Sequence, residues 1–308
     1  RGLGDVYKRQ VLDNRLGGRI EWYNKNTSDM LYSYPVPTPP YLYNEMMANV
    51  GDMRNRGVEV SLNADAIRTK DFEWNINVNF AHNDNEVTHL SNDRFTMDRV
   101  MVGDLFIRGG SSSSTHILEE GRPVGQFFGF VCKGLDADGH YIFVDQNGDG
   151  EISDPADYDY IGSAQPKLTY GITNSFRYKN FDLSFFLRGS LGNKVLNASR
   201  ASYAHPGFLP GTNALDDPLT FTLNQTPMIS DFYLENGSFM RLDNLTLGYK
   251  INALNGMRVY FTAQNLFVIT GYKGLDPEVP MDGLAPGVES REFYPKARTF
   301  SVGLNLNF

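Results

Sequence analysis

The stretch 145–153 carries oxygen-bearing side chains at the alternating positions that a calcium-binding loop uses. Asp145, Asn147 and Asp149 occupy positions 1, 3 and 5 of an EF-hand-type loop, and Gly150 occupies position 6, where such loops bend sharply. Glu151 follows that glycine. Side chains at this spacing converge on one ion, so Asp145, Asn147, Asp149 and Glu151 are candidate Ca²⁺ ligands.

The end of the same loop departs from the calcium-binding pattern. Ala156 stands at position 12, where a bidentate carboxylate normally completes the coordination shell. Asp154 and Asp157 are near enough to substitute for it, although no flanking helices are predicted. The alternative interpretation is an Asx-turn loop stabilised by contacts with its own backbone.

No residue pattern points to catalysis. The five histidines, at positions 82, 89, 116, 140 and 205, have no carboxylate or nucleophile spaced with them for acid–base chemistry. The single cysteine, Cys132, cannot form an internal disulfide, and no Cys/His spacing resembles a zinc site. We therefore expect a protein that is not an enzyme and has no certain cofactor, with Ca²⁺ as the one candidate.

Composition bounds the class of protein. The chain has 308 residues, of which 41% are hydrophobic and 21% charged, and this composition predicts a folded core. The formal charge is -8 and basic clusters are lacking, so nucleic acid is not an expected partner. A run of about 18 apolar residues is also lacking, which excludes a transmembrane helix but leaves a transmembrane β-barrel open.

Two-residue periodicity dominates the chain and predicts strands. In residues 58–66, for example, Val58, Val60 and Leu62 fall on one face, and Glu59 and Ser61 on the other. Asn174 interrupts one apolar face and Phe186 one polar face. About eight such strands and no convincing helix are predicted. Their approximate ranges are 16–32, 58–66, 72–80, 168–177, 181–188, 245–251, 259–267 and 300–308.

Short and long connections alternate between these strands. The turns 68–71, 178–180 and 252–256 are short, whereas 33–57, 91–166, 198–238 and 271–298 are long. All short turns should therefore lie at one end of the sheet and all long loops at the other, as in outer-membrane barrels. Several alternating stretches extend for about ten residues, which is the length that spans a bilayer at a tilt. Aromatic residues gather near the strand ends, where a membrane interface would lie.

The last strand has the pattern of an assembly signal. Gly303, Leu306 and Phe308 fit the terminal motif of bacterial outer-membrane proteins, in which the chain ends on an aromatic residue. A last strand of this kind offers the barrel assembly machinery an open edge for strand pairing.

Several stretches resemble the SusC/RagA family of TonB-linked outer-membrane proteins (TonB-dependent receptors). They include Tyr23–Asp29, Asn49–Glu59, Glu120–Gly125 and Asn265–Phe267, together with 145–150 and 162–166. They occur in the family's order, and the resemblance covers roughly residues 11–308.

This resemblance implies a fold and a function. The fold would be all-β, an antiparallel transmembrane β-barrel segment with long extracellular loops. It would form the C-terminal part of a receptor barrel of about 22 strands that also has an N-terminal plug. The whole protein would import oligosaccharides or peptides across the outer membrane of a Gram-negative, Bacteroidetes-type bacterium. Its partners would be a SusD-like surface lipoprotein, TonB acting through an absent N-terminal part, outer-membrane lipid and the barrel assembly machinery.

Some parts of the chain leave alternatives open. Residues 1–10 fit neither the family nor the alternation, so we expect an artefactual or non-homologous leader followed by a barrel region over 11–308. A passive porin or adhesin barrel would show the same alternation, and a secreted soluble carbohydrate-binding β-protein is a further alternative. Substrate contacts should come from lumen-facing polar residues and loop aromatics. The loop 198–238, with Tyr203, His205, Phe208 and Phe221, is the candidate region, although the sequence singles out no individual substrate residue.

Overall fold

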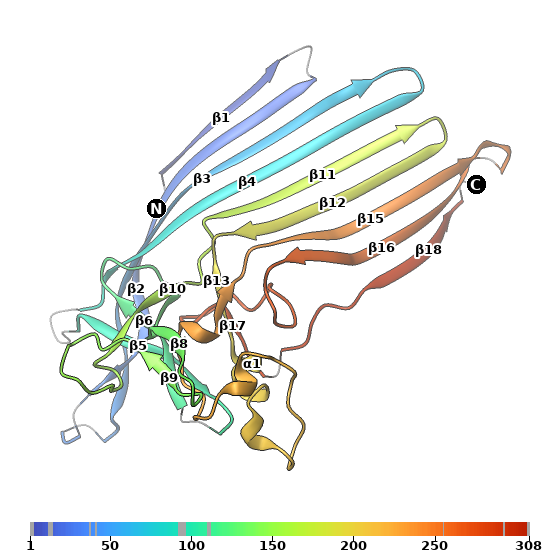
Figure 1. Ribbon diagram of the computed structural model, residues 1–308. Helices are drawn as coiled ribbons and strands as arrows, with labels where there is room; N and C mark the ends of the chain where they lie inside the picture. The colour runs from blue at the N-terminus through green and yellow to red at the C-terminus, as the bar shows by residue number, and fades with distance from the viewer. Residues whose placement is uncertain are drawn as a thin grey trace.

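One large antiparallel sheet runs through the chain, and smaller sheets gather at one of its ends (Figure 1). The computed structural model describes residues 3–11, 15–36, 38–40, 42–91, 97–109, 112–254, 256–291 and 293–306. Within these residues the large sheet, which we call the wall sheet, has nine strands. In spatial order they are β1 (Leu3–Val11), β2 (Leu16–Pro35), β3 (Glu45–Arg68), β4 (Phe72–His89), β11 (Leu168–Tyr178), β12 (Phe181–Leu191), β15 (Phe239–Ile251), β16 (Met257–Thr270) and β18 (Thr299–Asn305).

The smaller sheets form what we call the loop domain, made of the described residues of 90–167, 192–238 and 271–298. One sheet has the order β10 (Tyr158–Ser163), β7 (Gln126–Phe130), β6 (Ser112–Glu119) and β5 (Arg99–Phe106). The others are β14 (Leu234–Asn236), β13 (Lys194–Asn197) and β17 (Val288–Glu289), and the pair β8 (Cys132–Leu135) and β9 (Tyr141–Phe143). In the described ranges the helical elements are α1 (Ala198–Tyr203), η1 (Pro206–Phe208), η2 (Thr220–Thr222), η3 (Asp231–Tyr233) and η4 (Asn252–Leu254).

The predicted sorting of connections is confirmed. The hairpin turns after β3 and β11 lie at one end of the wall sheet, where β1 and β15 also end, and the loop domain lies at the other (Figure 1). We call these the turn end and the loop end. Every strand of the wall sheet runs antiparallel to its neighbours, as expected from the alternating pattern.

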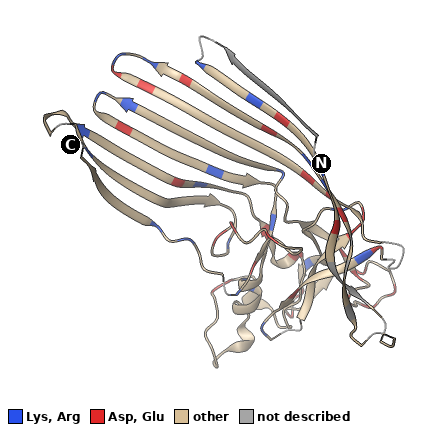
Figure 2. Cartoon of the chain, turned by 180° about the vertical axis from the view of Figure 1, so that it is seen from behind, with Lys and Arg blue, Asp and Glu red and all other residues tan. Residues whose placement is uncertain are grey.

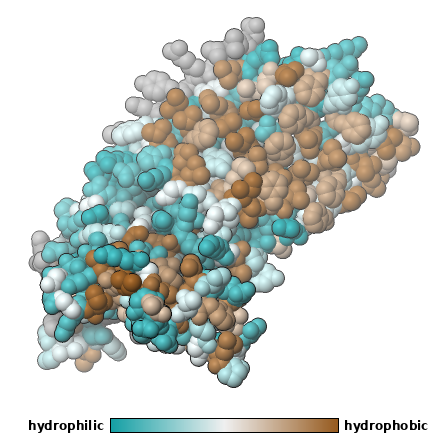
Figure 3. Space-filling model, in the orientation of Figure 1, coloured by the Kyte–Doolittle hydropathy of each residue, from teal (hydrophilic) through white to brown (hydrophobic). Residues whose placement is uncertain are grey.

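The two faces of the wall sheet differ in chemistry because the strand register keeps like residues together. Val60 lies opposite Phe80, and Phe80 lies opposite Tyr170, so apolar residues form rows across the strands. This apolar face is largely exposed, with Leu247 46% and Val302 76% exposed, and it appears as a brown surface in Figure 3. The opposite face carries hydroxyl and amide side chains and charged pairs such as Arg177–Glu73. Charged positions occur along many strands of the wall sheet (Figure 2).

The two exceptions to the alternation have physical explanations. Asn174 lies on the apolar face and is buried. Its polar side chain is tolerated there because its Oδ1 accepts a hydrogen bond of 3.1 Å from the Trp74 indole. Phe186 lies on the polar face, against Gly171. A Cβ added to Gly171 would lie 3.0 Å from Phe186 Cε2, so the absence of a side chain there gives the ring room to lie on the sheet.

Three expectations about the elements need correction. Residues 33–57 were expected to form a long loop, yet they mostly continue β2 and β3, and the connection spans only the residues between Pro35 and Glu45. The extended start of β3 is held to β4 by charged pairs, Arg54–Glu86 at 2.5 Å and Arg56–Asp84 at 2.7 Å. A search for apolar alternation does not detect strands of this kind.

The second correction concerns the start of the chain. Residues 1–10 were left out of the predicted fold, but Leu3–Val11 form β1, which pairs with β2 from Leu3 opposite Asn24 to Val11 opposite Leu16. Backbone amides and carbonyls make this ladder, so it does not depend on side-chain periodicity. The expected artefactual origin of these residues stays a prediction.

The third correction is the helix α1, where no helix was predicted. It has six residues, and the Asn197 side chain caps its first turn by accepting a 2.8 Å hydrogen bond from the Arg200 amide. A helix this short is below the window in which a 3.6-residue period can be recognised. Among the described residues, no helix is both long and apolar enough to cross a membrane.

Candidate functional site

The polar face of the wall sheet contains a recess of about 390 Å³ that four strands build together. Because strand side chains alternate, every second residue of β3, β4, β11 and β12 faces it. Glu59 and Arg188 give it charges of both signs, and Phe186 gives it an aromatic surface. Polar residues complete the lining, among them Ser61, Asn79 and Thr169.

An ionic cluster at the loop end ties the loop domain to the same polar face. Arg188 of β12 contacts Glu278 at 2.8 Å and Asp243 at 3.0 Å. Arg241 of β15 is 1% exposed and contacts Asp276 at 2.5 Å. Lys296 contacts Glu278 at 2.8 Å. Burial raises the pKa of Glu278, but hydrogen bonds from Arg188 and Lys296 outweigh this effect and hold that pKa below its usual value.

Asn265 completes this cluster from an unusual backbone position. Its φ of 51° lies in the left-handed region, beside the irregularity where β15 and β16 shift register. From there its Oδ1 accepts a hydrogen bond from Arg241, and its Nδ2 donates to the Lys296 carbonyl at 2.7 Å. The bulge therefore places the Asn265 side chain where it contacts both Arg241 of the wall sheet and Lys296 of the loop domain.

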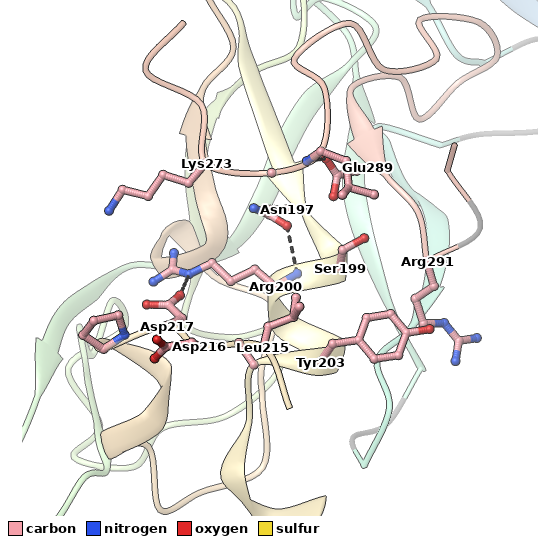
Figure 4. Close-up of a pocket in the computed structure, with 14 residues that line it drawn as sticks. Asn197, Ser199, Arg200, Tyr203, Leu215, Asp216, Asp217, Lys273, Glu289 and Arg291 are labelled. Carbon is pink, nitrogen blue, oxygen red and sulfur yellow. Dashed lines mark hydrogen bonds and ion pairs between the residues drawn. The ribbon is translucent and has the colours of Figure 1, made fainter. Parts of the chain in front are cut away.

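The loop domain has its own pocket, of about 510 Å³, which is shown in Figure 4. Four segments that are distant in sequence form its walls, namely residues 197–204, 215–218, 273–275 and 289–291. Arg200 of α1 is 8% exposed. Its guanidinium contacts Asp217, donates to the Phe232 carbonyl at 3.0 Å and lies 3.7 Å from Glu235. Burial raises the pKa of Asp217, but hydrogen bonds from Arg200 and the Leu219 amide outweigh it, so the pKa lies below its usual value.

A second buried charge, Glu289, lies on the other side of the pocket. Its Oε2 accepts hydrogen bonds from the Tyr272 hydroxyl at 2.9 Å and from the Leu275 amide at 2.7 Å. Within the described part of the chain, Glu289 Oε1 and Arg200 Nη2 are buried without a hydrogen-bond partner. Buried polar atoms are nearly always paired, so these two atoms mark the pocket as a place where polar groups of a ligand or water can bind.

The rim of the pocket mixes charged and apolar side chains. Asp216, Lys273 and Arg291 are exposed there, as are Leu215 (53%) and Leu275 (58%). Such a lining can hold a ligand by hydrogen bonds and apolar contact.

The structure distributes the predicted loop aromatics unevenly. Tyr203 lines the pocket. His205 and Phe208 contact each other instead, with ring centroids 5.7 Å apart, and Arg108 covers Phe208 at 4.4 Å. Phe221 is 42% exposed and is not part of the pocket lining. No sequence pattern marks Arg200 or Glu289, because only the fold brings these two residues together at the pocket.

The candidate calcium loop is closed by its own backbone. Asp145 accepts hydrogen bonds from the amides of Gly148 at 2.6 Å and Gly150 at 2.9 Å, and Asn147 and Asp149 each accept one from the residue two positions on. Glu151 follows in the same exposed turn. No group of three or more His, Cys, Asp or Glu side chains in the described ranges is arranged to hold a metal ion. Calcium binding by this loop stays a prediction.

The predicted assembly signal is partly described. Gly303 belongs to β18, opposite Tyr260, and Leu306 follows the strand with 53% exposure. Phe308 lies outside the described residues.

Comparisons with known proteins agree with this architecture. A family model described as "TonB dependent receptor-like, beta-barrel" matches residues 7–266. The chain is 36% identical over 315 residues to the TonB-dependent receptor SusC of Bacteroides thetaiotaomicron, covering 96% of this chain and 30% of that protein. It is 32% identical over 341 residues to the TonB-dependent receptor P3 of Formosa agariphila, covering 97% of this chain and 33% of that protein.

A solved structure extends the likeness to three dimensions. The structure of the RagAB peptide transporter superposes with a TM-score of 0.79 at 26% identity, covering 98% of this chain and 34% of the matched chain. The chain thus spans about a third of the length of the relatives that it matches.

Proposed function

This chain belongs to the TonB dependent receptor-like β-barrel family, in its SusC/RagA branch, and from that premise we propose that it forms part of an outer-membrane nutrient importer. In this proposal the wall sheet is a segment of the barrel in the outer membrane of a Bacteroidetes-type bacterium. The loop domain lies on the extracellular side. The cargo is an oligosaccharide or a peptide, and TonB supplies the energy through the rest of the receptor.

The observation that carries the proposal is the division of the wall sheet into two faces. Apolar residues continue in register from β2 to β18 and are exposed, whereas the other face is polar. This is the arrangement of a barrel wall between acyl chains and a wet lumen. The polar recess beside Phe186 and the loop-domain pocket beside Arg200 are then the surfaces that meet cargo on its way through.

Four partners follow from the same proposal. A SusD-like lipoprotein covers the loop end, and outer-membrane lipid surrounds the apolar face. TonB acts through the plug of the full-length receptor. The barrel assembly machinery engages β18 and the residues after it, where we propose that Gly303, Leu306 and Phe308 form the assembly signal.

Two other functions fit the structure less well. A secreted soluble β-protein would have to cover side chains such as Phe300 and Val302, which are 59% and 76% exposed on the apolar face. A passive porin or adhesin would share the barrel wall. The likeness to SusC and to the RagAB transporter over almost the whole chain favours the importer.

Uptake by the host bacterium tests the proposal. Cells that lack the full-length gene should stop taking up one oligosaccharide or peptide class, and the gene in trans should restore uptake. Loss of TonB should abolish the same uptake, because a passive pore needs no energy coupling. Normal uptake without TonB would overturn the importer proposal in favour of a porin.

A further inference from the structure

An aromatic row crosses the apolar face next to the turn end of the wall sheet. Phe72 of β4 lies opposite Tyr178 of β11, Tyr178 opposite Phe181 of β12, and Phe181 opposite Tyr249 of β15. The rings of Phe181 and Tyr249 are 4.6 Å apart between centroids. Tyr178 and Phe181 are each 52% exposed. Aromatic side chains in a continuous row of this kind are typical of a membrane interface.

Three lysines follow this row on consecutive turns. Lys70 lies in the β3–β4 turn, Lys179 in the β11–β12 turn, and Lys250 at the end of β15. The turns are joined by backbone hydrogen bonds of 2.9 Å, one from the Lys179 amide to the Asp71 carbonyl and one from the Lys250 amide to the Asn180 carbonyl. The three lysines therefore line a single edge, which we call the lysine edge.

The side chain of Lys179 lies on the apolar side of this edge, whereas Lys250 leaves β15 on the polar face and lies over Gly256 of the next turn. The Lys179 Nζ lies 5.5 Å from the centre of the Tyr178 ring, and Tyr178 belongs to the apolar face. The backbone supports this position, because Lys179 has a φ of 53°, the left-handed conformation of a tight hairpin turn. The Lys179 ammonium group is thus held beside the aromatic row rather than toward the polar face.

The lysine edge is free to meet an anion, whereas three other cations nearby have partners. Arg177 is paired with Glu73 and Arg258 with Asp182, and Arg15 donates to the Asp65 carbonyl. Lys70, Lys179 and Lys250 are exposed and form no salt bridge within the part of the chain that the structure describes. Asp71 is the acid adjoining this edge. Because the whole chain has a net charge of -8, an excess of positive charge here is local and not a general property.

We propose that the lysine edge binds the phosphate groups of anionic glycerophospholipids in the periplasmic leaflet of the outer membrane. This inference rests on the proposed function, which puts the apolar face in the bilayer and the turn end at the periplasm. Each lysine is one or two residues beyond the aromatic row, or roughly 3–7 Å at the rise of a strand. That distance takes an ammonium group from the interface to the headgroups, and Lys179, with its Nζ 5.5 Å from the centre of the Tyr178 ring, shows this position beside the aromatic row.

Lipid retention by the purified full-length receptor tests the proposal. The receptor is equilibrated in detergent with phosphatidylglycerol or with zwitterionic phosphatidylcholine, and bound lipid is counted by native mass spectrometry. We expect retention of phosphatidylglycerol in preference to phosphatidylcholine. The triple variant Lys70→Gln, Lys179→Gln and Lys250→Gln should bind phosphatidylglycerol about tenfold more weakly, since each cation near an anionic surface contributes measurably.

Matched variants test whether lipid retention depends on the lysine edge or only on the total positive charge of the chain. Lys25→Gln, Lys133→Gln and Lys194→Gln remove the same charge from exposed positions elsewhere and should retain phosphatidylglycerol like the unmodified receptor. Asp71→Asn, which removes the adjoining acid, should strengthen retention. Inorganic phosphate at equal concentration should not displace the lipid.

The outcomes distinguish this inference from the importer proposal. Equal binding of both lipids, equal loss in the two triple variants, or displacement by inorganic phosphate would overturn the lipid assignment and leave the importer intact. A receptor that retains neither lipid and partitions into water would contradict the membrane location itself, and the inference would fall with the proposed function.

Discussion

The wall sheet and the loop domain use the same kinds of residue in opposite ways. In the loop domain, apolar side chains such as Ile117 and Phe127 are completely buried and form clusters within the chain. In the wall sheet, Leu247, Phe261 and Val302 are 46%, 38% and 76% exposed. The loop domain therefore closes its own core, whereas the wall sheet needs a surrounding apolar medium to cover its face.

Charged residues differ between the two regions in the same way. At the loop end, Arg241 and Glu289 are buried and depend on specific partners. Along the polar face of the wall, pairs such as Arg177–Glu73 are partly exposed and open to water. Substitutions should thus have their largest effects where charge is buried at the loop end and where charge is introduced on the apolar face of the wall.

The largest expected effect is the loss of Arg241. Arg241→Ala leaves the Asp276 carboxylate, which is 4% exposed, without its cation, and breaking such a pair costs about 3–5 kcal/mol. Amide hydrogen exchange in the full-length receptor should accelerate over residues 271–291 and stay unchanged at the turn end.

Arg298→Ala is the matched control for that substitution. Arg298 is exposed in the connection 271–298. Its loss should change the free energy of local opening, measured by hydrogen exchange, by less than about 0.5 kcal/mol. Similar effects of both variants would mean that the ionic cluster does not anchor the loop.

A smaller effect is expected from a charge on the apolar face. Leu245 lies opposite Phe185 and Ala263 at the middle of β15, and Leu245→Arg should destabilise the barrel by about 2–4 kcal/mol in lipid. Its neighbour Thr246 lies on the polar face, opposite Ser184 and Thr262, so Thr246→Arg should cost under about 1 kcal/mol. Urea unfolding in phospholipid vesicles measures the free energy of unfolding of both variants. A larger loss for Thr246→Arg than for Leu245→Arg would show that the two faces are assigned wrongly.

Next in size is a pH effect that belongs to the loop domain. His116 is fully buried against Phe127, and burial lowers the pKa of His116 from 6.5 to about 4. Between these two pH values the unfolded chain binds a proton that the folded chain does not, so the loop domain loses stability as the pH falls. At pH 5 the loss is about 2 kcal/mol.

Hydrogen exchange of β6 and β7 at pH 7 and pH 5, corrected for intrinsic rates, measures this loss. His116→Gln should remove most of the difference because glutamine does not titrate, and its amide can still donate to the Pro286 carbonyl that His116 Nε2 contacts at 2.9 Å. An unmodified receptor with equal protection at both pH values would show that His116 is not held neutral.

The smallest effect is expected from calcium. If the loop at Asp145 binds Ca²⁺ with the millimolar affinity of weak extracellular sites, 1 mM Ca²⁺ should stabilise it by about 0.4 kcal/mol. Calorimetric titration of the full-length receptor checks this, with Asp145→Ala as the control. Absence of heat at millimolar Ca²⁺ would leave the loop as an Asx turn.

The sequence predicts the wall sheet better than it predicts the pocket of the loop domain. The wall strands with apolar alternation were predicted, because one face of each is uniform in chemistry. The polar extensions of β2 and β3 and the backbone-paired β1 were missed, since nothing in their alternation marks them. In the loop domain the aromatic Tyr203 was a candidate, but Arg200 and Glu289 were not, because four separate segments form that pocket.

Spin labels on neighbouring residues test most directly whether the apolar face meets acyl chains. In a Cys132→Ser background, single cysteines at positions 247, 261 and 302 sample one apolar row, and those at 246, 262 and 301 sample the adjacent polar row. In vesicles, labels on the first row should collide with lipid-dissolved oxygen, and labels on the second row with a water-soluble nickel chelate. Equal access of the nickel chelate to both rows would contradict a barrel wall in the membrane.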